Sequence, residues 1–358
     1  MALALIPSAY ESLLRPLLFR LPPEKAQHLA DQTLRAWPLW RGLSAFSAID
    51  PPELATTFGG MGIANPIGLA AGYDKNCQLT PALSSLGFGY VTCGTVTMDA
   101  RPGNPGVRLL RDSRNHALIN ALGFPGEGLD TVAENLSRDG QLVGSTPIIV
   151  SISGTEISDI VTCHRRLEPL VDAVEINISS PNTAGLRIFH DTGVLQELLL
   201  AVKEQRAKPI FVKMPPFPER DRDAEHHNLV LSLAEVCASA EVEGLTVANT
   251  QPIADVRLGV GTGGLSGKPI FWPMLRMVSE VRAAVGHSTT INACGGIFTA
   301  EDAWLALSAG ADTVQLLTGM VYKGPGIARN IARGLSRLTS RHGLSSIRDL
   351  SPVSDTGP

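Results

Sequence analysis

The sequence lacks the marks of several protein classes. Its five cysteines, at positions 77, 93, 163, 237 and 294, are widely separated and form no CxxC pair, so we expect no disulfide framework and no metal site, as in a reducing cytosol. No apolar run approaches the roughly 18 residues of a membrane span, and no basic segment at the N-terminus indicates a secretory signal. With 30 basic and 34 acidic side chains and no basic stripe, nothing indicates a nucleic-acid partner.

What is present predicts a packed globular protein. Of the 358 residues, 44% are hydrophobic and 18% are charged, which is typical of folded domains. This length is enough for one large α/β barrel or for two ordinary domains.

Eight short apolar runs alternate with longer helical patterns. They are rich in Val, Ile and Leu and bounded by Gly, Pro or Asn, which is typical of parallel strands buried on both faces. The runs span residues 67–71, 90–96, 147–152, 173–178, 209–214, 244–248, 289–294 and 312–317. Eight such units predict a (β/α)8 TIM barrel. A doubly wound sheet is the alternative, but the GxGxxG turn that usually follows its first strand is absent.

We expect a helical extension over residues 1–45, ahead of a barrel over residues 46–340. Apolar side chains at positions 10, 13, 14, 17 and 18 follow a helical spacing, and Pro16 should kink or end that helix. A second helix should start at Pro22-Pro23 and carry apolar residues at positions 26, 29, 30, 34 and 37. The two helices could simply pack on the barrel, or contact a membrane surface. Residues 341–358 show little periodicity, and we expect a loosely packed tail.

Polar side chains cluster where the predicted strands end, which is where barrel enzymes carry their chemistry. After the fourth strand, residues 177–183 read Asn-Ile-Ser-Ser-Pro-Asn-Thr, with two amides and three hydroxyls but no carboxylate, His or Cys. Any proton transfer in this segment must therefore use a hydroxyl. Each Asn here could also be an ordinary turn residue.

Two further features indicate a bound anion. Lys213 lies inside the apolar fifth strand, where it needs either a salt bridge or an electron-rich or anionic ligand such as a reduced flavin. Glycines follow the seventh strand at positions 295 and 296 and the eighth at position 319. Exposed backbone N–H groups there could hold a phosphate.

Several long motifs occur in a fixed order along almost the entire chain. They span residues 65–76 (Asn-Pro-Ile-Gly-Leu-Ala-Ala-Gly-Tyr-Asp-Lys-Asn), 101–105, 118–124, 177–183, 262–269 and 324–326. Together they resemble the quinone-linked, class 2 dihydroorotate dehydrogenases. The resemblance implies an FMN enzyme of pyrimidine biosynthesis that oxidises (S)-dihydroorotate to orotate and passes electrons to a membrane quinone.

The resemblance also implies residue roles. Ser180 would be the base that removes the C5 proton of dihydroorotate, and Thr183 would relay that proton. The substrate would be bound by Lys75, Asn120, Leu122, Gly123, Phe124, Asn177, Asn182, Asn249 and Thr250. FMN would be bound by Ala71, Gly72, Thr95, Ser151, Asn177, Lys213, Ala248, Ser266, Gly267, Gly295, Gly296, Leu317 and Thr318. Arg111 would line the quinone tunnel, and the N-terminal helices would form its entrance as a peripheral attachment to the cytoplasmic face of the cell membrane.

The sequence departs from the family pattern at several positions. Ser151 stands where the family has Asn at the end of the third strand, and Pro125 where Asn is usual. Ala248 replaces a usual Thr, Leu317 replaces a frequent aromatic residue, and Gln27 stands where some members have His. Two alternatives therefore stay open: a divergent flavin oxidoreductase acting on another dihydropyrimidine, and a non-catalytic barrel that has lost FMN.

Overall fold

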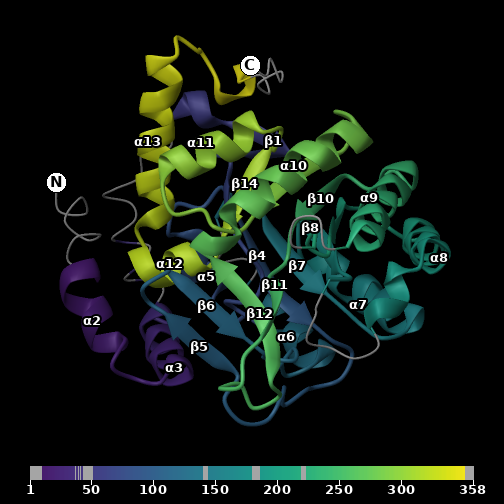
Figure 1. Ribbon diagram of the computed structural model, residues 1–358, viewed down its shortest axis with the longest axis horizontal. Coiled ribbons are helices and arrows are strands. Elements are labelled where there is room, and N and C mark those ends of the chain that lie inside the picture. The colour runs from purple at the N-terminus through teal and green to yellow at the C-terminus, as the bar shows by residue number, and fades with distance from the viewer. Residues whose placement is uncertain are drawn as a thin grey trace.

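The computed structural model describes residues 10–36, 38, 40, 42, 51–139, 144–179, 186–218 and 223–350. Eight parallel strands close into a barrel (Figure 1). These are β3 (Ile67–Leu69), β4 (Tyr90–Val96), β7 (Ile148–Ile152), β8 (Ala173–Asn177), β9 (Ile210–Lys213), β10 (Gly244–Val247), β13 (Thr290–Cys294) and β14 (Thr313–Leu316). All eight predicted strands are confirmed, with ends that differ by no more than two residues. Since β14 pairs with β3 to close the ring, the doubly wound alternative is excluded.

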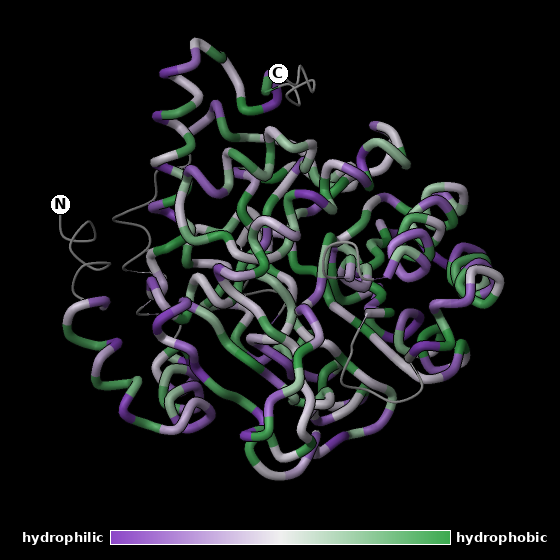
Figure 2. The backbone as a smooth tube through the Cα atoms, viewed as in Figure 1, coloured by the Kyte–Doolittle hydropathy of each residue, from purple (hydrophilic) through white to green (hydrophobic). Residues whose placement is uncertain are grey.

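Helices surround the barrel and bury one face against it. They are α5 (Thr80–Ser84), α6 (Leu129–Asp139), α7 (Ile157–Leu167), α8 (Thr192–Lys203), α9 (Ala224–Ser239), α10 (Phe271–Val285), α11 (Ala300–Ser308), α12 (Thr318–Lys323) and α13 (Ile327–Arg341). Short turns of helix are η3 (Pro52–Leu54), η5 (Glu168–Leu170), η6 (Leu186–His190), η7 (Lys268–Ile270) and η8 (Ile347–Asp349). Figure 2 shows hydrophobic residues concentrated in the barrel strands, while the outer helices carry both hydrophobic and hydrophilic residues. This pattern is expected where strands are buried on both faces and helices on one.

The amino end of the barrel is sealed by aromatic side chains. A hairpin of β1 (Thr56–Phe58) and β2 (Met61–Ile63) brings Phe58 onto the rings of Tyr90 and Phe211, with ring centroids 4.4 and 4.2 Å apart. We did not predict this hairpin. Its signal was the Gly59-Gly60 pair between two short alternating runs, a typical two-residue hairpin loop.

A second, antiparallel sheet lies outside the barrel. Its order is β11 (Gln251–Ala254), β12 (Thr262–Gly267), β6 (Ala117–Asn120) and β5 (Leu109–Asp112). The motif at residues 118–124 begins in β6, and the motif at residues 262–269 lies largely in β12. Figure 1 shows the edge strand β5 next to α3, where Arg108 Nε lies 2.8 Å from Glu24 Oε1. The sheet therefore joins the barrel to the N-terminal helices.

The N-terminal segment forms the two predicted helical pieces. A π-helical turn η2 (Tyr10–Leu14) leads into α2 (Arg15–Leu18), so the helix type changes next to Pro16. Pro22 precedes the first turn of α3 (Pro23–Leu34), as predicted; Trp37 lies outside the described residues. Within the described residues, no helix has the length and apolarity that crossing a membrane requires.

The beginning of the C-terminal tail differs from its prediction. Ile347 is buried, and Arg348 Nε donates a hydrogen bond to the Ala55 carbonyl at 3.1 Å. The tail is therefore packed against the barrel as far as residue 350, and the expectation of loose packing was wrong there. A single buried Ile among polar residues gave the sequence pattern too little periodicity to show this contact.

Candidate active site

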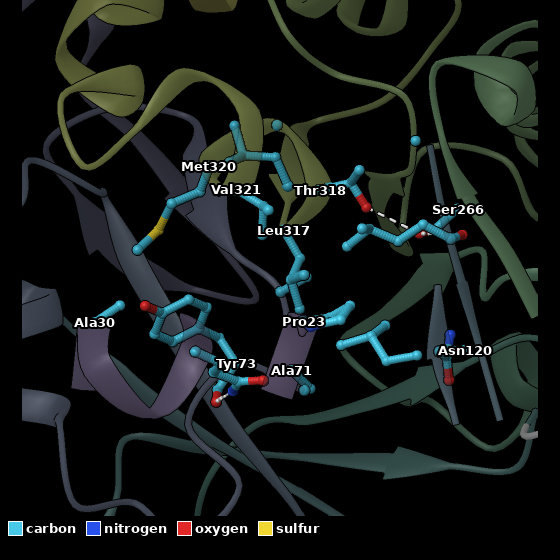
Figure 3. Close-up of a pocket in the computed structure, with 18 of the residues that line it drawn as sticks. Pro23, Ala30, Ala71, Tyr73, Asn120, Ser266, Leu317, Thr318, Met320 and Val321 are labelled. Carbon is cyan, nitrogen blue, oxygen red and sulfur yellow. Dashed lines mark hydrogen bonds between the residues drawn. The ribbon is translucent and has the colours of Figure 1, made fainter. Parts of the chain in front are cut away.

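A cavity of about 640 Å³ lies between the carboxyl end of the barrel, the antiparallel sheet and the N-terminal helices. Figure 3 shows Ala30 of α3 toward one side and Asn120 and Ser266 of the sheet toward the other, with Pro23 and Leu317 between them. The helix side is apolar, with Leu14, Leu17, Leu18, Leu29, Ala30 and Leu34 among its lining residues. The barrel side is polar. One continuous space therefore has an apolar helix side and a polar floor.

The structure brings nearly all the predicted site residues that it describes together around this cavity. The lining includes Ala71, Gly72, Lys75, Thr95, Arg111, Asn120, Leu122, Gly123, Phe124, Asn177, Lys213, Ala248, Asn249, Thr250, Ser266, Gly267, Gly295, Gly296, Leu317 and Thr318. Ser151 does not line it and is buried behind Thr95, with their hydroxyl oxygens 3.0 Å apart. Ser180, Asn182 and Thr183 lie outside the described residues.

A hydrogen-bond network fixes the amides of the floor. Asn177 at the end of β8 donates from Nδ2 to Thr95 Oγ1 at 3.2 Å. Its Oδ1 accepts from the backbone N–H and the hydroxyl of Ser179, at 3.1 and 2.8 Å. Asn249 Nδ2 donates to the same hydroxyl at 2.9 Å. The bond to the Ser179 N–H is the turn contact typical of Asn, but the wider network also holds both amides at the cavity wall.

Lys213 supplies a cation at the floor. Its side chain is only 5% exposed. Burial alone would lower the pKa of Lys213, but the neighbouring Cys294 and the carboxylate of Glu175 outweigh it, so the pKa lies above its ordinary value. The ammonium therefore stays charged where an electron-rich or anionic ligand can meet it.

A second lysine lies under the N-terminal helices. Lys75 Nζ donates to the Gly72 carbonyl at 2.7 Å, and burial lowers the pKa of Lys75 against the opposing charges of Asp31 and Asp74. Burial raises the pKa of both carboxyls to about 6. Asp31, on α3, was missed by sequence reasoning because it belongs to no motif; its Oδ1 is buried without a hydrogen-bond partner among the described residues.

Glycines open the wall after β13. Gly295 and Gly296 have φ angles of 135° and 72°, which non-glycine residues rarely adopt. A Cβ on Gly296 would lie 2.5 Å from Cβ of Phe271. Glycine at this position lets the turn pack closely against the start of α10, and both glycines line the cavity. Such a cradle suits a phosphate group.

Comparison with known proteins decides the family. The family model for dihydroorotate dehydrogenase matches residues 53–339. The chain belongs to the dihydroorotate dehydrogenase family. It is 38% identical over 348 residues to the dihydroorotate dehydrogenase (quinone) of Erythrobacter litoralis, covering 94% of this chain and 98% of the relative. The enzyme of the same name from Novosphingobium aromaticivorans is 37% identical over 352 residues, with coverage of 94% and 97%.

Solved structures agree with this assignment. The crystal structure of a dihydroorotate dehydrogenase from Eimeria tenella in complex with ferulenol superposes with a TM-score of 0.77 at 28% identity, covering 90% of this chain and 95% of that chain. The ligand-free form from the same organism gives a TM-score of 0.77 at 29% identity. The resemblance to quinone-linked dihydroorotate dehydrogenases that the motifs indicated is confirmed.

Arg111 of β5 connects the cavity wall to the N-terminal helices. Its guanidinium carbon lies 4.6 Å from the centre of the Phe19 ring, and Nη1 donates to the Leu21 carbonyl at 2.7 Å. Gln27 of α3 donates to the Tyr73 carbonyl at 3.2 Å. These contacts join the apolar helix side of the cavity to its polar part.

Proposed function

We propose that the protein oxidises dihydroorotate to orotate with bound FMN and passes the electrons to a quinone that enters between α2 and α3. The observation that carries this proposal is the single cavity, which contains both the polar floor and the apolar helix walls. Both comparisons of sequence favour this reaction, since the relatives at 37–38% identity are named as quinone-linked enzymes. No observation favours the other dihydropyrimidine substrate or the flavin-free barrel.

The floor has the chemistry that FMN requires. The glycine cradle at residues 295–296 suits the phosphate, and Lys213 suits the negative charge of a reduced ring. Asn177 and Thr95 present polar groups to the edges of a flat ligand. When bound, FMN would supply the acceptor for the hydride from dihydroorotate and the donor for quinone.

The chain's own residues would bind the substrate and move its proton. Lys75, Asn120, Asn177, Asn182, Asn249 and Thr250 are proposed to bind the carboxylate and amide groups of the pyrimidine. Ser180 is proposed to take the C5 proton and Thr183 to pass it on. A serine hydroxyl is a weak base and needs such an outlet.

The first experiment is an anaerobic visible spectrum of the purified protein before and after dihydroorotate is added. We expect a yellow flavin spectrum that bleaches, because the substrate transfers a hydride to FMN. A yellow sample that does not bleach would mean a different substrate. A colourless sample that takes up no added FMN would contradict the proposal as a whole.

Replacing Arg111 with alanine should damage the quinone reaction selectively. Loss of the hydrogen bond to Leu21 and the contact with Phe19 removes a charge-assisted link of about 1.5–3 kcal/mol, so the quinone KM should rise roughly tenfold or more. Reduction of FMN by dihydroorotate should be unchanged. Steady-state assays with varied quinone and stopped-flow bleaching separate the two steps.

The matched control is Arg114→Ala, at an exposed arginine of the same hairpin. If Arg111→Ala slowed both half-reactions equally, the assignment of Arg111 to the quinone side of the cavity would be contradicted.

The N-terminal helices are proposed to lie on the cytoplasmic membrane surface as a peripheral attachment. Leu13 is 66% and Leu17 58% exposed, and Leu21 and Leu29 are also exposed. Apolar side chains on a helix beside the cavity entrance would gain free energy from contact with lipid. The extension over residues 1–45 would then form the entrance and residues 46–340 the catalytic barrel.

The double variant Leu13→Gln/Leu21→Gln should bind vesicles of anionic phospholipid at least tenfold more weakly, because two leucines lose about 1 kcal/mol or more each on leaving lipid. Neither residue lines the cavity, so FMN reduction should be unaffected. Co-sedimentation measures the binding. Leu200→Gln is the control, since Leu200 is 50% exposed on α8, on the opposite side of the molecule from α2 (Figure 1). Equal binding by all three proteins would contradict the proposed contact.

A further inference from the structure

The barrel interior below the cavity contains a buried carboxylate. Glu175 of β8 is only 1% exposed, and its Oε2 accepts a hydrogen bond from Thr246 Oγ1 at 2.8 Å. Its Oε1 has no hydrogen-bond partner among the described residues. Burial of a carboxylate with a hydrogen bond to only one of its oxygens costs free energy. A positive charge nearby would offset this cost.

Strand register places Glu175 next to Lys213. Asn177 of β8 is the Cα partner of Lys213 on β9, and Glu175, two residues before Asn177, points to the same inner face. Thr246 of β10 is also a partner of Lys213. The carboxylate therefore bonds to a side chain at the level of the lysine. Glu175 and Lys213 form no direct ion pair, so their charges interact through space.

The neighbouring hydrogen bonds direct a donor at Glu175. Tyr90 donates from its hydroxyl to Asn292 Oδ1 at 2.8 Å, which turns the amide Nδ2 toward Thr246 Oγ1, 3.2 Å away. Since Thr246 accepts this bond, its own proton is directed at Glu175. The chain from Tyr90 through Asn292 and Thr246 thus ends on Oε2 of Glu175, which acts as acceptor.

The other titratable groups that face Lys213 and Glu175 are a thiol and a phenol, and both are buried. Burial raises the pKa of the Cys294 thiol on β13 and of the Tyr90 phenol on β4. Cys294 and Glu175 both raise the pKa of Lys213, and Glu175 is the carboxylate of the two.

We infer that Glu175 is a positioning residue that keeps Lys213 protonated at the cavity floor and so sets how strongly the site prefers reduced over oxidised FMN. The inference rests on the proposed function, because FMN is the ligand that Lys213 would meet. Without Glu175, burial would be opposed less strongly, and Lys213 would lose its proton at a lower pH than in wild type. The site would then lose its cation for the negative charge of reduced FMN.

The test compares FMN-loaded wild type with Glu175→Gln, which removes the charge and keeps the shape. Spectroelectrochemical titration from pH 6 to pH 9 measures the preference for reduced FMN. At pH 6, where Lys213 is charged in both proteins, Glu175→Gln should prefer reduced FMN more strongly than wild type does. Between pH 6 and pH 9 this preference should fall in both proteins, and it should fall about tenfold further in the variant. Tenfold corresponds to about 30 mV for a two-electron couple.

Two results would overturn the inference. One is a Glu175→Gln curve parallel to wild type at every pH. The other is an additional fall that persists in Lys213→Met/Glu175→Gln, since the titrating group would then not be Lys213. The double variant contains neither of the two buried charges. It therefore shows the pH dependence of the site in the absence of the Glu175–Lys213 pair.

A readout without FMN keeps this inference separate from the proposed function. In protein free of FMN, the NMR resonance of ¹³C-methylated Lys213 should titrate at a lower pH in Glu175→Gln than in wild type. An identical titration in both proteins would reject the inference. Failure of the wild-type protein to take up FMN would instead reject the proposed cofactor, whatever the lysine titration shows.

Discussion

Ser180→Ala should slow the reduction of bound FMN by dihydroorotate on the order of 10²-fold or more, the usual effect of losing a general base. The proposed reaction breaks the C5–H bond, and residues 177–183 contain no carboxylate, His or Cys to replace the hydroxyl. Asn177 and Ser179 at the floor would still hold the cavity wall. FMN should therefore remain bound, and stopped-flow bleaching under anaerobic conditions measures the rate.

Two further variants make this result specific. Ser180→Cys should retain far more of the rate, because class 1 dihydroorotate dehydrogenases, by the resemblance, use Cys at this position. Ser158→Ala, on the surface-facing side of α7, should behave as wild type. Near-normal bleaching by Ser180→Ala would remove Ser180 from the mechanism and leave its neighbours to be tested.

Phe211→Ala should lower the free energy of unfolding by about 3–5 kcal/mol, as is typical when a large buried aromatic side chain is truncated. Phe211 is 1% exposed, and its ring centroid lies 4.2 Å from that of Phe58 in the seal at the amino end of the barrel. Removing it leaves a space that the closed barrel can only partly fill. Urea denaturation followed by circular dichroism gives the change.

An exposed aromatic residue provides the control. Trp272 is 69% exposed at the start of α10, so Trp272→Ala should change the free energy of unfolding by no more than about 0.5 kcal/mol. If Phe211→Ala also cost under 1 kcal/mol, the aromatic seal would contribute little to stability, and the barrel bottom would have to be held by the strand pairing alone.

The barrel strands were predictable because their signal is local. Runs such as β7 (Ile148–Ile152) are apolar throughout and buried throughout, so they need no knowledge of their neighbours. The polar interior was not predictable. Glu175 sits inside an apolar strand, and its hydrogen-bond partner Thr246 is 71 residues away in the sequence. Only closure of the barrel brings the two side chains together.

The residues of the site also fall into a predictable and an unpredictable group. Motif residues such as Lys75 and Asn249 were found because family resemblance carries their positions, and the structure places both at one cavity. Asp31 and Ser179 were missed because their roles arise from contacts made in the fold. Ser179 in particular links Asn177 to Asn249, although it stands in the motif directly beside the residue proposed as the base.

Closure of the ring also has a consequence for biosynthesis. The last barrel strand, β14, pairs with the first, β3, and Leu316 is the partner of Leu69. During translation, one edge of β3 therefore has no partner strand until β14 has been synthesised. Unpaired edges invite association with other chains. Nascent chains that stop before Thr313 should therefore aggregate or depend on chaperones, whereas chains that extend past Leu316 can complete the barrel.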